Sequence, residues 1–532
     1  MPRPNVIIIM ADDLGFSDIA PFGGEIDTPA LQKLADQGTR MSSFYVTPRC
    51  SPSRAAMLTG RNPHSVGIGV LTTDNRPNGY AGSLSAEVPT LAERLKDRGY
   101  ATGIFGKWHL ASETKTPSET WPTRRGFDEF RGILPGATSY YRPPLMQGEE
   151  RVADDQLDDD FFLTDDITAS GVDFVRRHGA TDHPYFLFMT YTAPHWPLHA
   201  AEEDIQKYRE RFAGGWDAAR LERLRRLKVS GLLPEMDELP PGQPLPEWDE
   251  KNALWQTERM AVYAAQVESL DRGVGQILEA VSATDSEDDT IVLFFSDNGG
   301  CSEDLPVGMN YFAEDVAPRA TRAGSVVRFG NDPAILPGAE DTYQSYGEEW
   351  ATVSNTPFRK WKRWVHEGGI STPFIASWPN GGLAGGGGIN RSLGHITDVV
   401  PTILAAVDAL PESGALPAGA AGGGVDGCNL LPAWRDPDAD IGDRTLYWEH
   451  VGNAALRRGA LKLVREWGGE WELYDLSVDR TESVDLAIDR PEVVALLAAD
   501  YMRWAEEHDV MPWQDVLDDY AARGLHPMRA MG

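Results

Sequence analysis

One cysteine stands where a reactive group would be stabilised. Cys50 is followed by Ser-Pro-Ser-Arg and then Ala-Ala-Met-Leu, a pattern that predicts a turn leading into a helix. The free N–H groups and the positive end of the helix dipole, together with the guanidinium of Arg54, would stabilise negative charge at residue 50. Because a lone cysteine in this setting is more often a buried structural residue, the other motifs decide between the two interpretations.

Four oxygen-bearing side chains follow two predicted strands. The apolar runs at 5–10 and 290–296 are continuous, as expected of strands buried on both faces. The polar pairs that follow them are Asp12-Asp13 and Asp297-Asn298. An isolated Asp-Asp pair is more often a solvated turn, but open α/β sheets bind ligands at the carboxyl ends of such strands. Three carboxylates and one amide oxygen favour Ca²⁺, with Mg²⁺ second, over Zn²⁺.

A lysine and two histidines follow other predicted strands. Lys107 and His109 are two residues apart on an extended segment, so both would face one anion. The apolar strand predicted at 184–191 runs into a proline-stiffened loop that carries His195, with His199 as the competing candidate. An exposed lysine and a capped histidine would explain the first pair equally well if it stood alone.

Helices and strands alternate between these residues. Caps, stops and apolar patterning predict strands at 5–10, 100–105, 184–191 and 290–296, and helices at 28–38, 85–99 and 254–283. The helix at 28–38 has Thr28 as its cap and Gly38 as its stop. This alternation predicts an α/β protein with a largely parallel sheet.

Two regions differ from this pattern. Residues 200–255 combine charged helical sequence with a proline-rich stretch, which predicts a surface insertion whose basic cluster is solvated. Beyond residue 435, short strands at 445–449, 459–464 and 471–475 precede a closing helix from Pro491 to about His508. Short strands followed by a helix predict a small antiparallel α+β domain.

The motifs together resemble one enzyme family, the type I sulfatases, and within it the bacterial arylsulfatases. The strings that carry the resemblance are Cys-Ser-Pro-Ser-Arg-Ala-Ala-Met-Leu-Thr-Gly-Arg at 50–61, Gly-Lys-Trp-His at 106–109, Ser-Asp-Asn-Gly at 296–299 and Glu-Leu-Tyr-Asp-Leu at 472–476. The resemblance implies a large mixed, mostly parallel sheet sandwiched by helices, as in alkaline phosphatase, over residues 1–435, with the insertion at about 200–255. It implies an antiparallel sheet plus helix over 436–532.

The resemblance also implies a chemistry. In sulfatases the cysteine is oxidised after translation to formylglycine, whose hydrate is the nucleophile, so Cys50 would be matured by a formylglycine-generating enzyme. The implied metal ligands are Asp12, Asp13, Asp297 and Asn298. The implied catalytic set is Cys50, Arg54 holding the hydrate, Lys107 and Lys362 on the sulfate, His195 on the leaving oxygen and His109 as the base.

The lysine of the last motif has a competitor. In sulfatases a lysine stands five residues before Glu-Gly-Gly, which selects Lys362. This chain has Lys360-Trp361 where the family commonly has two glycines, so Lys360 stays in contention. If the motif stood alone, a basic turn would be an equally good explanation.

Composition limits the partners and the location. The net charge of −32 disfavours nucleic acid and long polyanions as partners, but affects a small monoanion much less. Three cysteines in 532 residues agree with a reducing compartment. No apolar run approaches a membrane span and the amino terminus has no leader pattern, so we expect a cytoplasmic protein without membrane contact.

The expected function is hydrolysis of small aryl sulfate monoesters. Two alternatives remain. The same residues would suit phosphonate or phosphate esters, since the site recognises a tetrahedral anion. An unmodified Cys50 would leave a non-catalytic, calcium-dependent anion-binding protein. The sequence does not predict an oligomeric state.

Overall fold

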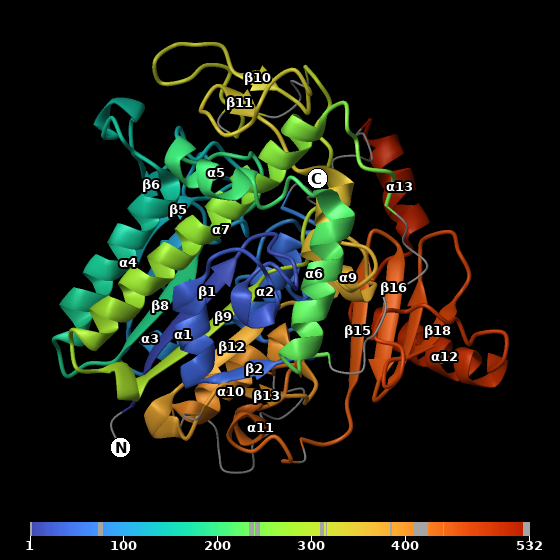
Figure 1. Cartoon of the computed structure of the whole chain (residues 1–532). Helices are drawn as coiled ribbons and strands as arrows, with labels where there is room; N and C mark the ends of the chain where they lie inside the picture. Colours follow the sequence, from blue (N-terminus) through green and yellow to red (C-terminus); the bar gives the residue numbers. More distant parts are fainter. Residues whose placement is uncertain are drawn as a thin grey trace.

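The computed structural model describes residues 3–72, 78–233, 239, 245–308, 313–314, 316–383, 386–407, 424–439 and 441–524. Within these ranges a ten-stranded main sheet and a separate four-stranded sheet lie side by side (Figure 1). In spatial order the main sheet consists of β13 (Gly388–Asn390), β2 (Thr39–Met41), β12 (Phe374–Ser377), β9 (Thr290–Ser296), β1 (Asn5–Ala11), β8 (Tyr185–Thr190), β4 (Ala101–Lys107), β5 (Glu129–Ile133), β6 (Met146–Gln147) and β7 (Glu150–Arg151). In the described part of the chain, no helix is both long and apolar enough to cross a membrane.

The central strands of the main sheet are parallel. β9, β1, β8, β4 and β5 run in one direction, and β12 pairs antiparallel with both β9 and β2. Ala11 at the end of β1 is in register with Ser296 at the end of β9. The residues that follow these strands therefore emerge at one edge of the sheet, which is the arrangement that the sequence predicts.

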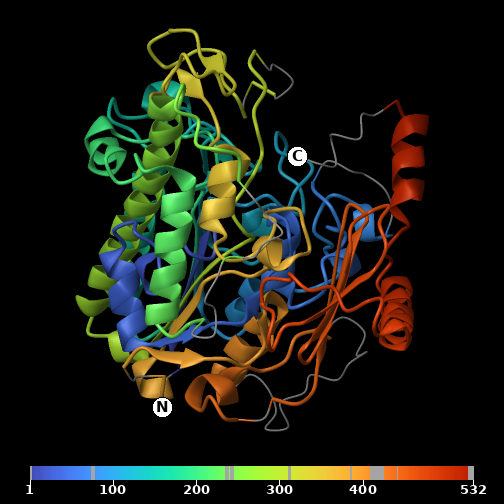
Figure 2. The ribbon, with the colours of Figure 1, turned by 45° about the vertical axis from the view of Figure 1, so that its right-hand side comes forward.

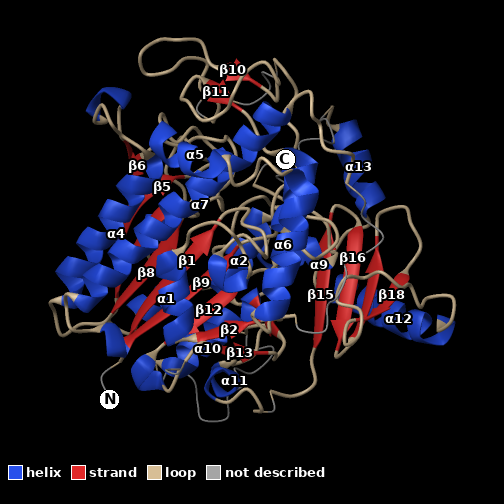
Figure 3. Cartoon of the chain, viewed as in Figure 1, coloured by secondary structure: helices blue, strands red, loops and turns tan. Residues whose placement is uncertain are grey.

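Each face of the main sheet buries its own hydrophobic cluster. In β1, Ile7 and Ile9 join one cluster, while Val6, Ile8 and Met10 join the other, because successive side chains of a strand point to opposite faces. The first cluster is covered by α1 (Pro29–Gln37), α4 (Leu163–Gly179), α5 (Glu202–Arg209), α6 (Gly215–Val229), α7 (Ala253–Ser282) and α8 (Gly347–Ser354). The second is covered by α2 (Cys50–Thr59), α3 (Leu91–Lys96), α10 (Val399–Ala406) and α11 (Leu431–Arg435). Figure 3 shows α4 and α7 lying across one face of the strands.

The second sheet is antiparallel, as the sequence predicts. Its strands in order are β15 (Thr445–His450), β16 (Asn453–Arg458), β17 (Leu461–Arg465) and β18 (Glu472–Asp475). The helix α12 (Pro491–Glu507) packs on β16 and β17, and a further helix, α13 (Trp513–Ala522), follows it (Figure 2). The short pairs β10 (Arg328–Phe329) with β11 (Thr342–Tyr343) and β3 (Phe44–Tyr45) with β14 (Gly394–His395) complete the strands of the described residues.

A buried ionic cluster joins the four-stranded sheet to the segment that carries Glu367. Lys462 of β17 contacts Glu367 at 2.9 Å and Glu482 at 2.7 Å, and all three side chains are fully buried. Glu367 opens the short helix α9 (Glu367–Ile370), five residues after Lys362. The four-stranded sheet thus holds the segment that carries the last predicted site residue.

One predicted helix is too long, and two elements were not predicted. The helix expected at 85–99 is only α3, because Thr90 and Glu93 form a capping box and Pro89 keeps the preceding residue extended. The strand β16 was not expected, since its Asn-Ala-Ala-Leu-Arg-Arg sequence lacks β-branched and aromatic residues. The closing helix α12 is not the last element, because α13 follows it.

The predicted insertion is more firmly attached than the sequence suggests. Part of it, 234–238 and 240–244, lies outside the described residues. Its helix α6 carries the basic cluster expected to be solvated, yet Arg223 is fully buried and contacts Asp18 at 2.6 Å and Glu25 at 2.8 Å. Arg225 of the same cluster is exposed, as predicted. The helix therefore uses one of its cations to dock beside the loop that follows β1.

Candidate active site

The four predicted metal ligands lie together at the edge of the main sheet. Because β1 and β9 end in register, the two polar pairs meet: Asn298 Nδ2 donates to Asp13 Oδ1 at 2.6 Å, and the Asp13 N–H donates to Asp297 Oδ1 at 3.3 Å. The four side chains belong to residues that are at most 1% exposed. Asp13 has a left-handed backbone, φ 66°, which aspartate adopts more readily than most residues. This edge of the sheet is therefore a dense patch of buried oxygen atoms.

Each carboxylate of this patch accepts a hydrogen bond from a different cation. Lys107 Nζ donates to Asp12 Oδ2 at 2.6 Å, and Lys362 Nζ donates to Asp13 Oδ2 at 2.8 Å. The guanidinium of Arg54 donates twice to Asp297 Oδ2, at 3.1 and 2.8 Å. We call these six side chains the acid–base cluster: Asp12, Asp13, Asp297, Lys107, Lys362 and Arg54. Its pairs are buried, so removing one partner would leave an uncompensated charge.

The pKa values in the cluster diverge. Burial, reinforced by the charge of Asp12, raises the pKa of Asp297 to about 7. Burial alone would also raise the pKa of Asp13, but the cations around it, Lys362 first, together outweigh burial and lower that pKa to about 2. Three carboxylates crowded together thus need further positive charge to be ionised at once.

A divalent cation fits this need. Among the described residues, Asp12 Oδ1 and Asn298 Oδ1 are buried without a hydrogen-bond partner. Two buried oxygens without a donor carry a desolvation cost that a hard cation would remove. Ligand atoms of Asp12, Asp13 and His195 also lie within 4.8 Å of one another. The donor set therefore suits Ca²⁺ or Mg²⁺, with an imidazole alongside that the predicted ligand set did not include.

Cys50 opens the helix α2. The helix begins at Cys50 itself, after Arg49 in an extended conformation, and ends at Gly60 with φ 70°. The Cys50 thiol is buried, and its Sγ lies 3.3 Å from His109 Nδ1. Arg54, one turn later, reaches Asp297, and its Nη1 donates to the Lys107 carbonyl at 2.8 Å. The structure thus places residue 50 at a helix N-terminus beside an imidazole.

Lys107 and His109 serve different neighbours. Lys107, the last residue of β4, contacts Asp12, whereas His109, with φ 56°, turns back to Cys50. Burial, followed by the charges of Lys107 and Arg54, lowers the pKa of His109 well below its usual value. The imidazole beside Cys50 is therefore neutral.

His195, and not His199, lies at the cluster. Its Nε2 is 3.3 Å from Lys362 Nζ and 3.4 Å from Asp13 Oδ2. Its Nδ1 donates to the Trp196 carbonyl at 2.6 Å, so the Nε2 lone pair faces the lysine. Burial is the main cause that lowers the pKa of His195 to about 3. His199 instead contacts the Thr342 carbonyl, 2.7 Å away.

The two candidate lysines separate clearly. Lys362 is buried, which alone would lower its pKa, but the acidic groups around it, Asp13 first, together outweigh burial and raise the pKa of Lys362 well above its usual value. Lys360 is directed elsewhere: its Nζ contacts Glu466 at 3.0 Å and lies over the Trp364 ring, 4.3 Å from the centroid. Only Lys362 belongs to the acid–base cluster.

Two residues of the site were not predicted. Glu303 accepts hydrogen bonds from Arg49 Nη1 and from Trp196 Nε1, both at 2.8 Å. Glu303 belongs to no motif, and its partners come from segments far away in the sequence, so no local pattern indicates it. Arg49 directly precedes Cys50, and its charge next to the helix start was the available signal.

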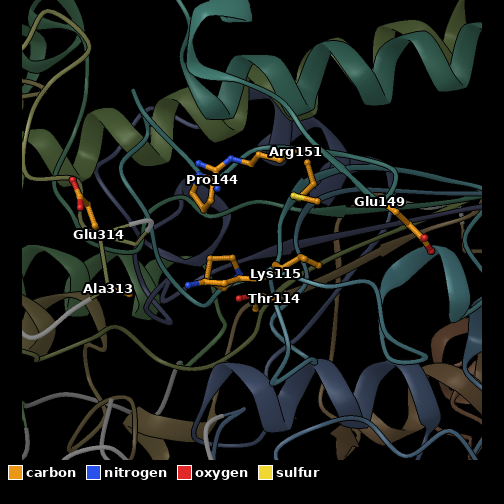
Figure 4. A pocket seen from close by; sticks show the side chains of 10 residues that line it. Thr114, Lys115, Pro144, Glu149, Arg151, Ala313 and Glu314 are labelled. Atoms are coloured by element: carbon orange, nitrogen blue, oxygen red, sulfur yellow. The ribbon is translucent and has the colours of Figure 1, made fainter.

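A pocket lies on the His109 side of the site. Lys115, Arg151 and Glu314 line it, as Figure 4 shows. Leu134 also lines this pocket, whose volume is about 480 Å³. The Leu134 carbonyl accepts the His109 N–H at 3.1 Å. The pocket is thus linked to His109 through the backbone of one of its lining residues.

The fold and the site together are those of an α/β enzyme whose buried acids and bases surround a candidate nucleophile. Comparison with known proteins specifies the class. A family model described as Sulfatase matches residues 4–409. An uncharacterized sulfatase of Schizosaccharomyces pombe is 31% identical over 563 residues, covering 98% of this chain and 96% of that protein. The chain belongs to the sulfatase family.

One further relative is similar in sequence, and one solved structure is similar in fold. An arylsulfatase of Klebsiella aerogenes is 33% identical over 420 residues, covering 75% of this chain and 86% of that protein. The crystal structure of Ps i-CgsB in complex with k-i-k-neocarrahexaose has a TM-score of 0.69 at 23% identity, with 99% of each chain covered. That second likeness concerns the fold alone.

Proposed function

We propose that the protein hydrolyses small aryl sulfate monoesters, with a nucleophile derived from Cys50. The observation that carries the proposal is the contact between Cys50 Sγ and His109 Nδ1, 3.3 Å apart at the start of α2. The 33% identity to an arylsulfatase supports the aryl leaving group. In this proposal a formylglycine-generating enzyme matures Cys50, and the hydrated aldehyde supplies two hydroxyls on one carbon, one to attack sulfur and one through which sulfate is expelled.

Asp12, Asp13, Asp297 and Asn298 would hold Ca²⁺, with Mg²⁺ as second choice. When bound, the cation would offset charge on the sulfate oxygens. The chain's own cations act alongside it: Lys107 and Lys362 hold their positions through Asp12 and Asp13. Both ammonium groups are buried, where fixed charges act more strongly than in water.

The remaining residues move protons. The neutral imidazole of His109 would take a proton at Nδ1, the atom that faces residue 50. His195 would act on the leaving oxygen together with Lys362, because the Nε2 lone pair of His195 faces the lysine ammonium at 3.3 Å. The lysine is thus the nearest source of the proton that a poor leaving group needs.

A comparison of matched esters tests the proposal. We expect kcat/KM for 4-nitrophenyl sulfate to exceed that for 4-nitrophenyl phosphate and for a phenyl phosphonate ester. A preference for either phosphorus ester would favour the alternative hydrolase, and no turnover of any ester by fully matured protein would favour a binding protein.

We also propose a cytoplasmic location, supported by the three free cysteines, Cys50, Cys301 and Cys428.

A further inference from the structure

One carboxylate joins the two sides of the active site. Glu303 follows β9, and its two oxygens accept from different segments: Arg49 Nη1 contacts Oε1 at 2.8 Å, and Trp196 Nε1 contacts Oε2 at 2.8 Å. Arg49 immediately precedes Cys50, and Trp196 immediately follows His195. A single side chain therefore bridges the neighbours of the candidate nucleophile and of the candidate acid.

The Trp196 contact bears directly on the His195 imidazole. The Trp196 carbonyl accepts the Nδ1–H of His195 at 2.6 Å, and the two rings lie 4.5 Å apart between centroids. Trp196 thus supports the imidazole in two ways, through its backbone carbonyl and through its indole ring. Because the Glu303 bond fixes the indole, it also limits rotation of the imidazole whose Nε2 faces Lys362.

The Arg49 contact bears on the start of α2. The Arg49 carbonyl accepts the Ser53 N–H at 3.0 Å and the Thr47 hydroxyl at 3.1 Å, so Arg49 fixes the first turn of the helix. Its side chain is only 4% exposed, and Glu303 is its ion-pair partner. A buried guanidinium without that partner would be costly, so the backbone beside Cys50 depends on the carboxylate.

Glu303 is ionised in this setting. Burial alone would raise the pKa of Glu303, but the charges of Lys362 and Arg49 act against it, and the pKa lies well below its usual range. An ionised carboxylate accepts both hydrogen bonds at full strength. The same charge also lies on the side of the site where Lys362 and His195 meet.

We propose that Glu303 is a positioning residue that holds residue 50 and His195 in the relative arrangement required for leaving-group expulsion. The inference rests on the proposed function. Glu303 touches neither the reacting atoms nor the predicted metal ligands in the described structure; it acts through Arg49 and Trp196. An ordinary structural ion pair would stabilise the fold equally well but would have no effect specific to the leaving group.

The test is a leaving-group series in matched variants. Glu303→Gln keeps the shape but can accept from only one of the two donors. Trp196→Phe replaces the indole by a smaller aromatic ring beside His195 that cannot donate to Glu303. Misplacement by a fraction of an ångström should lower kcat for phenyl sulfate about 10- to 100-fold, with a smaller loss for 4-nitrophenyl sulfate and little change in KM. Asp304→Asn, a charge change at the adjacent residue whose side chain is 73% exposed, is the control and should leave the series unchanged.

Two results would overturn the inference. An equal loss for both esters in Glu303→Gln would reduce Glu303 to a structural role. Additive losses in the double variant Glu303→Gln/Trp196→Phe would show that Glu303 does not act through Trp196. If Glu303→Gln fails to fold, the Trp196→Phe series alone decides in the same way. Wild-type protein without sulfatase activity would instead refute the proposed function, so the two failures are distinct.

Discussion

Asp12, Asp13 and Asp297 share one small buried volume, yet each contacts a different cation. Within the acid–base cluster, Lys107 holds Asp12, Lys362 holds Asp13, and Arg54 holds Asp297. The resemblance assigned Arg54 to the nucleophile, whereas its described side-chain bonds go to Asp297 and to the Lys107 carbonyl. Arg54 therefore couples the predicted metal site to the helix that begins at Cys50.

The first prediction at the residue scale concerns Cys50. In active protein the peptide containing residue 50 should have lost one sulfur and two hydrogens and gained one oxygen, because a thiolate lacks the second hydroxyl through which sulfate is expelled. Mass spectrometry of the peptide spanning 41–61 measures this. Cys50→Ala should abolish turnover while leaving calcium binding largely intact.

Two other cysteines provide an internal control for this measurement. Cys301 is buried and Cys428 is half-buried, and burial raises the pKa of both thiols, so their peptides should remain unmodified in the same digest. Full activity in a preparation whose Cys50 is entirely thiol would end the formylglycine proposal.

The second prediction at this scale concerns His195. His195→Ala should reduce turnover of poor leaving groups by about 10²- to 10⁴-fold and of activated ones far less, because only poor leaving groups need a proton in the transition state. Steady-state kinetics over a series of substituted phenyl sulfates measures the difference. The exposed His183 offers a matched histidine-to-alanine control that should show no trend. Equal losses across the series would move the acid role from His195 to Lys362 or elsewhere.

At the scale of elements, the predicted start of α1 is correct but its predicted capping residue is wrong. The helix begins at Pro29 after Thr28, as the sequence predicts, but the Thr28 hydroxyl accepts the Ala20 N–H instead of capping the helix. Asp271 of α7 caps α1, accepting the N–H groups of Ala30 at 3.0 Å and Leu31 at 2.8 Å. The cap thus also fixes α1 against α7.

This cap gives a prediction with a pH dependence. Asp271→Ala should lower the free energy of unfolding by about 1–3 kcal/mol, since it leaves two helix N–H groups without an acceptor. Burial raises the pKa of Asp271 from 3.8 to about 6, so the folded state favours the protonated form. The stability that this adds is complete below about pH 4 and is lost as the pH rises to about 6. Denaturant unfolding of wild type and Asp271→Asn at both pH values measures the difference; a constant difference would contradict the buried, raised pKa.

What the sequence could predict follows from how local each signal is. β1 and β9 are continuous apolar runs, so their type, their ends and the polar pairs behind them are visible without a structure. β16 forms because β15 and β17 flank it, and its own composition does not favour a strand. Glu303 and Asp271 act on partners far away in the chain, which only the tertiary structure brings to them.

At the scale of the whole molecule, the C-terminal part completes the surroundings of Cys50. Cys50 shares a hydrophobic cluster with Val451, which follows β15, and with Trp513 and Val516 of α13. A second contact, between buried Lys462 and Glu367, lies five residues along the chain from Lys362. We therefore propose residues 1–435 and 436–532 as two structural units of one catalytic body.

The last prediction concerns the stability of the whole molecule without its metal. The cation would join residues 285 positions apart, Asp13 and Asn298, at the edge where β1 and β9 end. Binding to the folded state alone adds about 2.7 kcal/mol to the free energy of unfolding when the free cation is at 100 times its Kd. Protein dialysed against a chelator should therefore unfold at a lower temperature and lose activity, and added Ca²⁺ should restore both at lower concentration than Mg²⁺. Asp12→Asn removes the negative charge of a carboxylate whose buried Oδ1 accepts no hydrogen bond, so this variant should respond more weakly to Ca²⁺. Unchanged Tm and activity after rigorous chelation would show that Asp12, Asp13, Asp297 and Asn298 hold no functional cation.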